Sequence, residues 1–234
     1  MIAKTEEVKK GLMQQLLTKG IGHTEYKDSE LGYIPSLWNL SKLSDISHKI
    51  NDGAHHTPTY TESGVNFLRV TDIKGDTIDW GNTKFISKDE HEVLIKRCNP
   101  ELGDILLSKN GTIGQVKLID FDKEFSIFVS LCLIKPNHDL IYNKFLAYYL
   151  QTDIVMKQFL KRSKSGTVTN LHLEEIRQVT VPIPPYEEQL EIAQKIDFIH
   201  CLLNKEMKRY EKLAQIKRGL MQQLLTGQVR VKID

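Results

Sequence analysis

The sequence predicts an α+β (mixed α/β) domain that is followed by a long coiled-coil-forming helix and preceded by a short N-terminal helix. Two observations lead to this fold class. Residues 190–226 contain no proline and a single glycine, and their apolar residues recur at steps of three and four, which is the spacing of one helix face. Residues 40–183 contain short apolar runs separated by turn residues, a pattern typical of strands mixed with short helices.

The N-terminal segment 3–19 also has helical spacing. Its apolar face consists of Leu12, Met13, Leu16 and Leu17. Gly20 is expected to end this helix. The polar stretch 23–38 that follows is interpreted as a linker, and two large apolar residues, Ile34 and Trp38, are expected to anchor its end.

The middle of the chain, residues 38–184, is predicted to form the α+β domain. Strands are expected at 66–70, 84–87, 103–108, 115–119 and 125–134, and helices at 88–96, 142–160 and 171–176. Glycine and polar residues mark loops at 51–60, 109–114 and 161–167.

The last segment, residues 185–234, is dominated by the long helix. Its predicted apolar stripe, which we expect to pair with a second copy or another partner helix, consists of Ile192, Ile196, Ile199, Leu203, Met207, Tyr210, Leu213, Leu220 and Leu224. About 40 residues give a rod of about 60 Å, which is longer than a small domain can cover. The alternative is a long helix that packs on its own domain.

An internal repeat links the two helical ends of the chain. Residues 9–18 match residues 217–226 except that Lys10 is replaced by Arg218. The segment 1–37 therefore begins with a copy of the end of the long helix, and the chain is interpreted as one period of a longer, two-period molecule.

Composition and cysteine spacing argue against a secreted, disulfide-rich protein. The net charge of +2 neither requires nor forbids a nucleic-acid partner, and the 40% hydrophobic and 26% charged fractions are ordinary for a globular protein. Three scattered cysteines form no metal-binding or disulfide spacing, and the N-terminus does not resemble a signal peptide. We therefore expect a cytoplasmic protein without a membrane partner.

The sequence contains no recognisable catalytic or metal site. His55 and His56 are adjacent, so they point apart on an extended chain, and the glycines at 111 and 114 do not form a dinucleotide-binding motif. The acidic pairs Glu174-Glu175 and Asp89-Glu90 are interpreted as solvated helix faces. An unrecognised enzyme remains an alternative, which purified protein altering DNA on its own would support.

The three loops carry residue types suited to contact DNA. Lysine and arginine pair with phosphates or guanine, asparagine pairs with adenine, and threonine methyl groups contact thymine. The candidate DNA-binding residues are Asn51, His55, His56, Thr57, Tyr60, Lys109, Asn110, Thr112, Lys161, Arg162, Lys164, Ser165 and Thr167. For any one of them, an ordinary surface loop is the alternative.

Motifs spread along the chain resemble the specificity (S) subunit family of type I restriction-modification systems. They are YKDSELGYIP at 26–35 with Trp38, Gly53 with Thr57-Pro58, FLR at 67–69 with Asp72-Ile73, GDIL at 103–106 with Gly111 and Gly114, SGT at 165–167 with Asn170-Leu171, and IPP at 183–185 with Glu188-Gln189. The ending LAQIKRGLMQQLL at 213–225 is the most characteristic.

This resemblance implies a non-catalytic subunit in which each of two target-recognition domains reads half of a bipartite, interrupted DNA sequence. Two helical regions would set the spacing between the halves and dock the DNA methyltransferase (methylation) subunits. S-adenosylmethionine, ATP and Mg²⁺ would bind the partner subunits, which include the restriction subunit, and the chain itself would need no cofactor.

The sequence departs from the family pattern because it contains one recognition domain instead of two. We therefore interpret it as a half-size S subunit: a natural half, a truncated gene product or part of a longer one. Two copies are expected to pair through the long helix. The alternative is a truncated interaction protein that binds the methylation subunit without productive DNA recognition.

Overall fold

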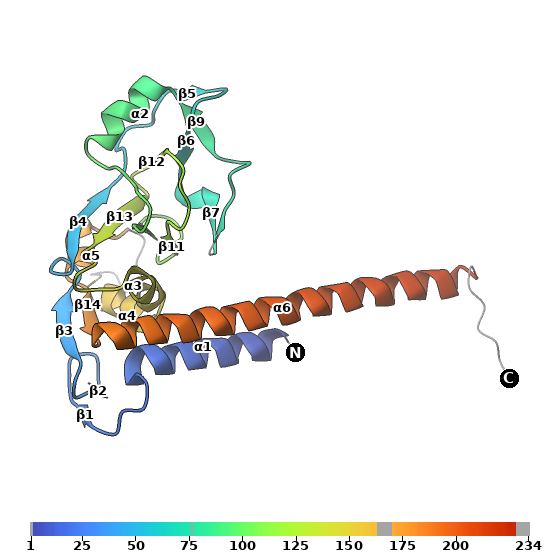
Figure 1. The fold of residues 1–234 in the computed structure, drawn as a ribbon. Helices are drawn as coiled ribbons and strands as arrows, with labels where there is room; N and C mark the ends of the chain where they lie inside the picture. Colours follow the sequence, from blue (N-terminus) through green and yellow to red (C-terminus); the bar gives the residue numbers. More distant parts are fainter. Residues whose placement is uncertain (1, 76, 163–169, 228–234) are drawn as a thin grey trace. The chain divides into compact units, whose positions relative to one another are not determined.

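The computed structural model describes residues 2–75, 77–162 and 170–227, without the side chains of residues 2–6, 9 and 162. Its contacts divide the chain into two compact units. One consists of Gln14–Ala193, and the other of Met1–Met13 with Gln194–Asp234. The fold is mixed α/β with a short N-terminal helix and a long C-terminal helix, so the predicted fold class is confirmed (Figure 1).

Two four-stranded sheets form the centre of the unit 14–193. The first is antiparallel, in the order β11 (Val116–Leu118), β10 (Ile105–Ser108), β13 (Leu131–Pro136) and β4 (Ser47–Asp52). The second has the order β12 (Phe125–Ile127), β6 (Val65–Leu68), β9 (Lys84–Ile86) and β5 (Tyr60–Thr61), and only its β12–β6 pair is parallel.

Shorter elements complete this unit. Three two-stranded ladders join β1 (Tyr26–Lys27) to β2 (Ile34–Pro35), β3 (Asn39–Lys42) to β14 (Thr180–Ile183), and β7 (Ile73–Lys74) to β8 (Thr77–Ile78). The helices are η1 (Val70–Asp72), α2 (Lys88–Ile95), α3 (Asn143–Leu150), α4 (Asp153–Arg162) and α5 (Leu173–Arg177). Helix α2 contacts β12, α3 contacts β11 and α5 contacts β4 (Figure 1).

The predicted strand 125–134 is wrong as a single element, because it forms two strands in two different sheets. The chain turns after β12, where the Leu131 amide donates to the Phe128 carbonyl (2.9 Å). This turn lets both strands contribute to one core, in which Phe125, Leu131 and Leu133 are buried together. The run of apolar residues predicts burial correctly, but it does not reveal that the chain changes sheets.

The predicted helix 142–160 is also divided, into α3 and α4. At the break, the amide and the hydroxyl of Thr152 both donate to the Tyr149 carbonyl, at 3.0 and 2.8 Å. Asp153 then begins α4 with a carboxylate in its first turn, where the helix dipole favours a negative charge. The apolar spacing continues across the break because both helices bury residues of this stretch, including Tyr149 and Val155.

The two helices that bound the chain are close to their predicted positions. Helix α1 spans Ile2–Lys19 and α6 spans Tyr186–Leu225, a length of 40 residues. Gly20 and Gly227 follow them with φ values of 64° and 71°, the left-handed conformation that ends helices. None of the described helices has the length and apolar character needed to cross a membrane.

Within the unit that contains them, the first part of α1 lies beside α6 and runs in the opposite direction (Figure 1). The Met13 Sδ atom lies 3.4 Å from His200 Nε2.

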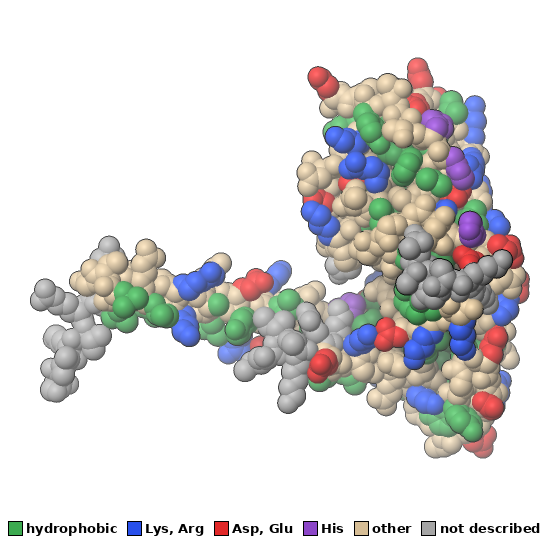
Figure 2. Space-filling view, turned by 180° about the vertical axis from the view of Figure 1, so that it is seen from behind, with side chains coloured by type: hydrophobic (Ala, Val, Ile, Leu, Met, Phe, Trp, Pro, Cys, Tyr) green, Lys and Arg blue, Asp and Glu red, His purple; other side chains and the backbone are tan. Residues whose placement is uncertain are grey.

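The predicted stripe of α6 changes environment along the helix. Ile192 and Ile196 are fully buried, and Ile199, Leu203 and Met207 are partly buried. Beyond them, the stripe is exposed at Tyr210, Leu213, Leu220 and Leu224. Figure 2 shows hydrophobic side chains gathered along one side of this part of the helix.

Candidate nucleic-acid interface

The first predicted loop begins at the end of β4 with a buried carboxylate. Asp52 lies 3.0 Å from His55 Nε2, 2.6 Å from Arg97 Nη2 and 3.3 Å from Lys109 Nζ. The neighbouring Asn51 donates to the Arg97 carbonyl at 3.0 Å. One acidic side chain therefore gathers two cations and a histidine from three separate segments.

The surroundings of Asp52 keep it ionised. Burial by itself raises the pKa of the Asp52 carboxyl group, but the hydrogen bond with His55 and the positive charge of Lys109 outweigh burial, so the pKa lies below its usual value. The Arg97 and His55 side chains remain more than half exposed. They could turn toward a phosphate without leaving the site.

Sequence reasoning missed Arg97. It lies just after α2, outside the three predicted loops. The available signal was the basic pair Lys96-Arg97 at the end of a predicted helix, which is an ordinary surface feature until the fold places it against Asp52.

The second predicted loop connects β10 to β11 and is fixed from within. The buried Ser108 hydroxyl donates to the Thr112 carbonyl at 2.5 Å and accepts from the Gln115 amide at 2.8 Å. Gly111 and Gly114 adopt φ values of 76° and 83°, which glycine accepts most readily. This geometry leaves Thr112 exposed at the loop.

The second loop also meets the segment that follows the third. Asn110 forms a β-bridge with Asn170, and the Leu171 amide donates to the Lys109 carbonyl at 2.8 Å. Since Lys109 also pairs with Asp52, the fold connects the first loop, the second loop and the segment 170–171, which lies beyond the third loop. The buried Asn110 Oδ1 has no hydrogen-bond partner among the described residues.

The predicted DNA-binding residues fall into several environments. His55, His56, Thr57, Tyr60, Thr112 and Lys161 are exposed, and Asn51 and Asn110 are partly buried. The Lys109 side chain is only 8% exposed, and its ammonium group is directed at Asp52. His56 lies 3.8 Å from Glu90 on α2. Arg162 ends α4 and its side chain is not described, while Lys164, Ser165 and Thr167 lie outside the described residues.

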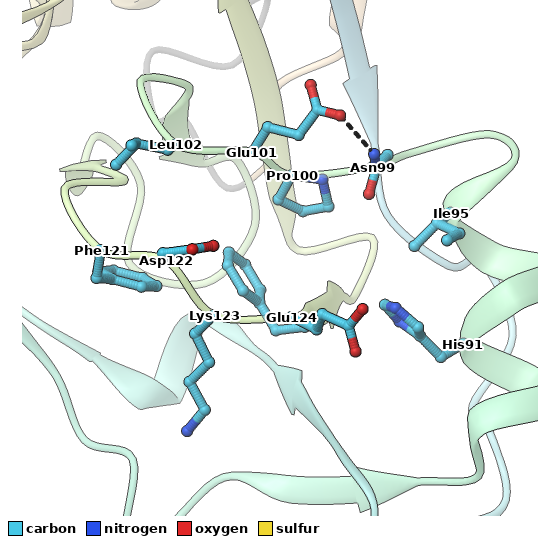
Figure 3. Close-up of a pocket in the computed structure, with 11 residues that line it drawn as sticks. His91, Ile95, Asn99, Pro100, Glu101, Leu102, Phe121, Asp122, Lys123 and Glu124 are labelled. Atoms are coloured by element: carbon cyan, nitrogen blue, oxygen red, sulfur yellow. Dashed lines mark hydrogen bonds between the residues drawn. The ribbon is translucent and has the colours of Figure 1, made fainter.

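A cavity of about 300 Å³ lies elsewhere in the same unit, between α2 and the segments 99–102 and 121–125 (Figure 3). Three carboxylates line it, those of Glu101, Asp122 and Glu124, and the Glu124 side chain points toward His91. Burial lowers the pKa of His91. Three carboxylates against one lysine, Lys123, repel phosphate, so this cavity does not suit a nucleic-acid backbone.

The described residues contain no group of three or more histidine, cysteine, aspartate or glutamate side chains that could hold a metal ion. Cys98 and Cys132 are buried, and burial raises the pKa of Cys98 to about 11, so its thiol is unreactive. The geometry of the described residues therefore provides surfaces for binding.

Comparison with known families gives a match over most of the chain. Residues 35–218 match the family described as the type I restriction modification DNA specificity domain. The chain belongs to this family.

Similarity to curated specificity subunits and to solved structures agrees with this family match. The MjaVIII specificity subunit of Methanocaldococcus jannaschii is 27% identical over 97% of this chain and 54% of its own length. A chain solved in a study of complex assembly and conformational transition of the type I R-M system has a TM-score of 0.66 at 18% identity, covering 95% of this chain and 52% of that one. The HsdS subunit from Thermoanaerobacter tengcongensis has a TM-score of 0.62 at 17% identity, covering 95% and 51%. The chain thus spans about half the length of these relatives.

Two of the motifs that carry the resemblance to specificity subunits have structural roles here. A Cβ atom on Gly53 would lie 2.0 Å from the Ile127 carbonyl oxygen, so only glycine allows this approach of β4 to β12. Arg69 donates to both oxygens of the buried Asp72, at 3.1 and 2.9 Å, and its own amide donates to Asp72 at 2.8 Å. Gly53 thus allows two strands to approach, and the Arg69–Asp72 pair fixes the turn after β6.

The acidic residue of the motif at the start of α6 holds the linker. Glu188 accepts hydrogen bonds from the Ile21 amide at 3.1 Å, from His23 Nε2 at 2.7 Å and from Trp38 Nε1 at 2.9 Å. The predicted anchors Ile34 and Trp38 are buried, as expected. The motif residue thus explains how a polar linker is fixed to the first turn of the long helix.

The neighbouring Gln189 is 1% exposed and joins α6 to the segment before α3. Its oxygen accepts from the Tyr142 amide at 2.7 Å, and its nitrogen donates to the carbonyls of Pro184 and Leu140 at 2.9 and 3.3 Å. The Glu188-Gln189 pair therefore connects the linker, the domain and the helix at one point.

Proposed function

We propose that this chain is a non-catalytic, half-size specificity subunit that reads one half of a bipartite, interrupted DNA target. In this proposal, two copies pair through α6 and the helices dock methylation subunits, through which the restriction subunit joins the complex. S-adenosylmethionine, ATP and Mg²⁺ bind those partners, and the chain needs no cofactor of its own.

The observation that carries the proposal is the meeting of the first two candidate loops with the segment after the third. Asp52 joins the first loop to Lys109 of the second, and the Asn110–Asn170 bridge joins the second to Asn170, three residues beyond the end of the third. Specific readout needs several base-contacting groups held in a fixed arrangement, together with cations that position the backbone. Exposed His55, Arg97 and Thr112 supply groups of both kinds.

Two substitutions test the division between backbone and base contacts. Lys164→Gln should weaken binding to all duplex sequences and reduce the slope of log affinity against log salt by about 1, because a phosphate contact is lost. Thr112→Ala should instead change the preferred base at one position. Selection from a random duplex library with the methylation subunit present, followed by salt titration, measures both effects, and Lys27→Gln on β1 serves as the control.

An unchanged salt slope would remove Lys164 from the interface. If the chain with its methylation subunit selects no sequence at all, the recognition function is wrong. The alternative, an interaction protein that binds the methylation subunit without productive DNA recognition, then takes its place.

A further inference from the structure

The internal repeat places one sequence in two environments of the same chain. Residues 9–18 and 217–226 differ only at Lys10 and Arg218. Both copies are helical and end with the same local bond: the Thr18 hydroxyl donates to the Gln14 carbonyl and the Thr226 hydroxyl to the Gln222 carbonyl, each at 2.7 Å. Any difference between their side chains therefore comes from what surrounds each copy.

Those surroundings differ strongly. Leu17 is fully buried, whereas its counterpart Leu225 is 83% exposed. Met13 is partly buried, with its sulfur 3.4 Å from His200, whereas its counterpart Met221 is 49% exposed. Within its unit, Met13 of the N-terminal copy thus marks a surface that this sequence packs against: the part of α6 around His200.

Transfer of this contact to a second copy gives a definite register. If Met221 of one copy takes the place that Met13 occupies, it lies beside His200 of the other copy. In an antiparallel pair, the two-fold axis then passes between Tyr210 and Glu211. The same register places Ile196 opposite Leu225 and Met207 opposite Ala214, so apolar residues meet on both sides of the axis.

We propose that α1 competes in cis for the α6 surface that the C-terminal repeat copy, residues 217–226, of a second molecule binds in the dimer. This rests on the proposed pairing of two copies through α6. The two occupants have nearly the same sequence and would contact the same residue, so they exclude each other. Helix α1 therefore covers the surface in the single chain and sets how tightly two chains associate.

The repeat offers a matched pair of variants to test this. Met13→Asp and Met221→Asp place the same charge in the same sequence context, once in the proposed competitor and once in the proposed partner segment. Sedimentation equilibrium should show that Met13→Asp strengthens dimerisation at least about tenfold, because the competitor is weakened. Met221→Asp should weaken dimerisation by at least about tenfold, because a buried methionine contact is lost.

The opposite result for Met13→Asp overturns the proposal. A weaker dimer would make α1 part of the interface. An unchanged dimer would mean that the second copy binds elsewhere, for example along the exposed residues Phe198 and Leu202. The milder Met13→Gln, compatible with a helix, should change association in the same direction as Met13→Asp, and circular dichroism checks that each variant is folded.

A peptide measurement separates this proposal from dimerisation itself. A fluorescent peptide of residues 209–227 should bind the Met13→Asp chain at least about tenfold more tightly than the wild-type chain, and the peptide with Met221→Asp should not bind. If all chains stay monomeric while the peptide shows this preference, the pairing in the proposed function is wrong and the competition by α1 stands. If the peptide binds both chains equally, the competition is wrong, whatever the state of the dimer.

Discussion

At the residue scale, the most informative side chain is Asp52. Its side chain is 5% exposed and balances Arg97 and Lys109, which come from segments far apart in the sequence. Lys109 is itself buried, so each charge needs the other. The cluster therefore serves two purposes: it fixes the loops in place and it keeps basic groups at the candidate interface.

We expect Asp52→Asn to lower the free energy of unfolding by about 3 kcal/mol, because Lys109 would remain buried without an opposite charge. Urea unfolding measures this change. Asp79→Asn is the control, because its partner Lys74 lies on the surface and the variant should lose much less. Equal losses in the two variants would show that burial of Lys109 contributes nothing.

The effect of Asp52→Asn on the free energy of unfolding should depend on pH. The pKa of Asp52 is lowered in the folded protein, so its stabilising effect is present above the unfolded-state pKa and is lost as the pH falls through the folded-state pKa. The stability difference between wild type and Asp52→Asn should be constant near neutral pH and should narrow below about pH 4. Urea midpoints across this range, measured for both proteins, test the sign.

Two glycines between α1 and the linker provide a second test at this scale. Gly20 and Gly22 both have positive φ, but only Gly20 is crowded: a Cβ atom there would lie 2.4 Å from Glu188 Oε1 and 2.7 Å from the Trp38 ring. Gly22→Ala should cost about 1 kcal/mol of stability, from backbone strain alone, and Gly20→Ala about 3 kcal/mol. Thermal or urea unfolding of the pair distinguishes crowding from strain.

At the scale of elements, the start of α6 is the junction that organises the unit 14–193. Glu188 and Gln189 point in different directions from one helical turn, and each binds three groups of other segments. The family motif at this place is therefore explained by hydrogen bonding within the chain, without any contact to DNA.

We expect Glu188→Gln to destabilise the protein by about 2 kcal/mol. The Ile21 backbone amide, His23 and Trp38 all donate to the carboxylate. A glutamine side chain has an NH2 group in place of one carboxylate oxygen, so at least one of these three donors would lose its acceptor. Glu187→Gln is a matched control because Glu187 is the exposed neighbour, and it should change stability by less than about 0.5 kcal/mol. A similar loss of stability for both variants in urea unfolding would contradict the role of Glu188 in holding the linker.

At the scale of the whole molecule, the decisive prediction is association between two copies. The described part of α6 exposes large apolar residues from Tyr210 onward, and exposed apolar surface of this kind marks an interaction site. A two-fold dimer would present two recognition domains and so would read a palindromic, interrupted sequence.

Light scattering tests this prediction directly. The chain should have the mass of a dimer and should take up two methylation subunits when they are added. The selected DNA sequence should then be symmetric about its spacer. A monomer that remains a monomer with the methylation subunit present would leave only a half-complex, and the second half would have to come from another chain.

The sequence by itself determined the features that depend on neighbouring residues: both bounding helices, the buried linker anchors, the position of the first two loops and the family. These follow from local spacing, turn chemistry and short motifs. Only the tertiary structure decided that 125–134 is divided between two sheets, that Lys109 and Arg97 meet at Asp52, and that Glu188 holds the linker. These features join residues distant in the chain, and a pattern of neighbours carries no information about such pairs.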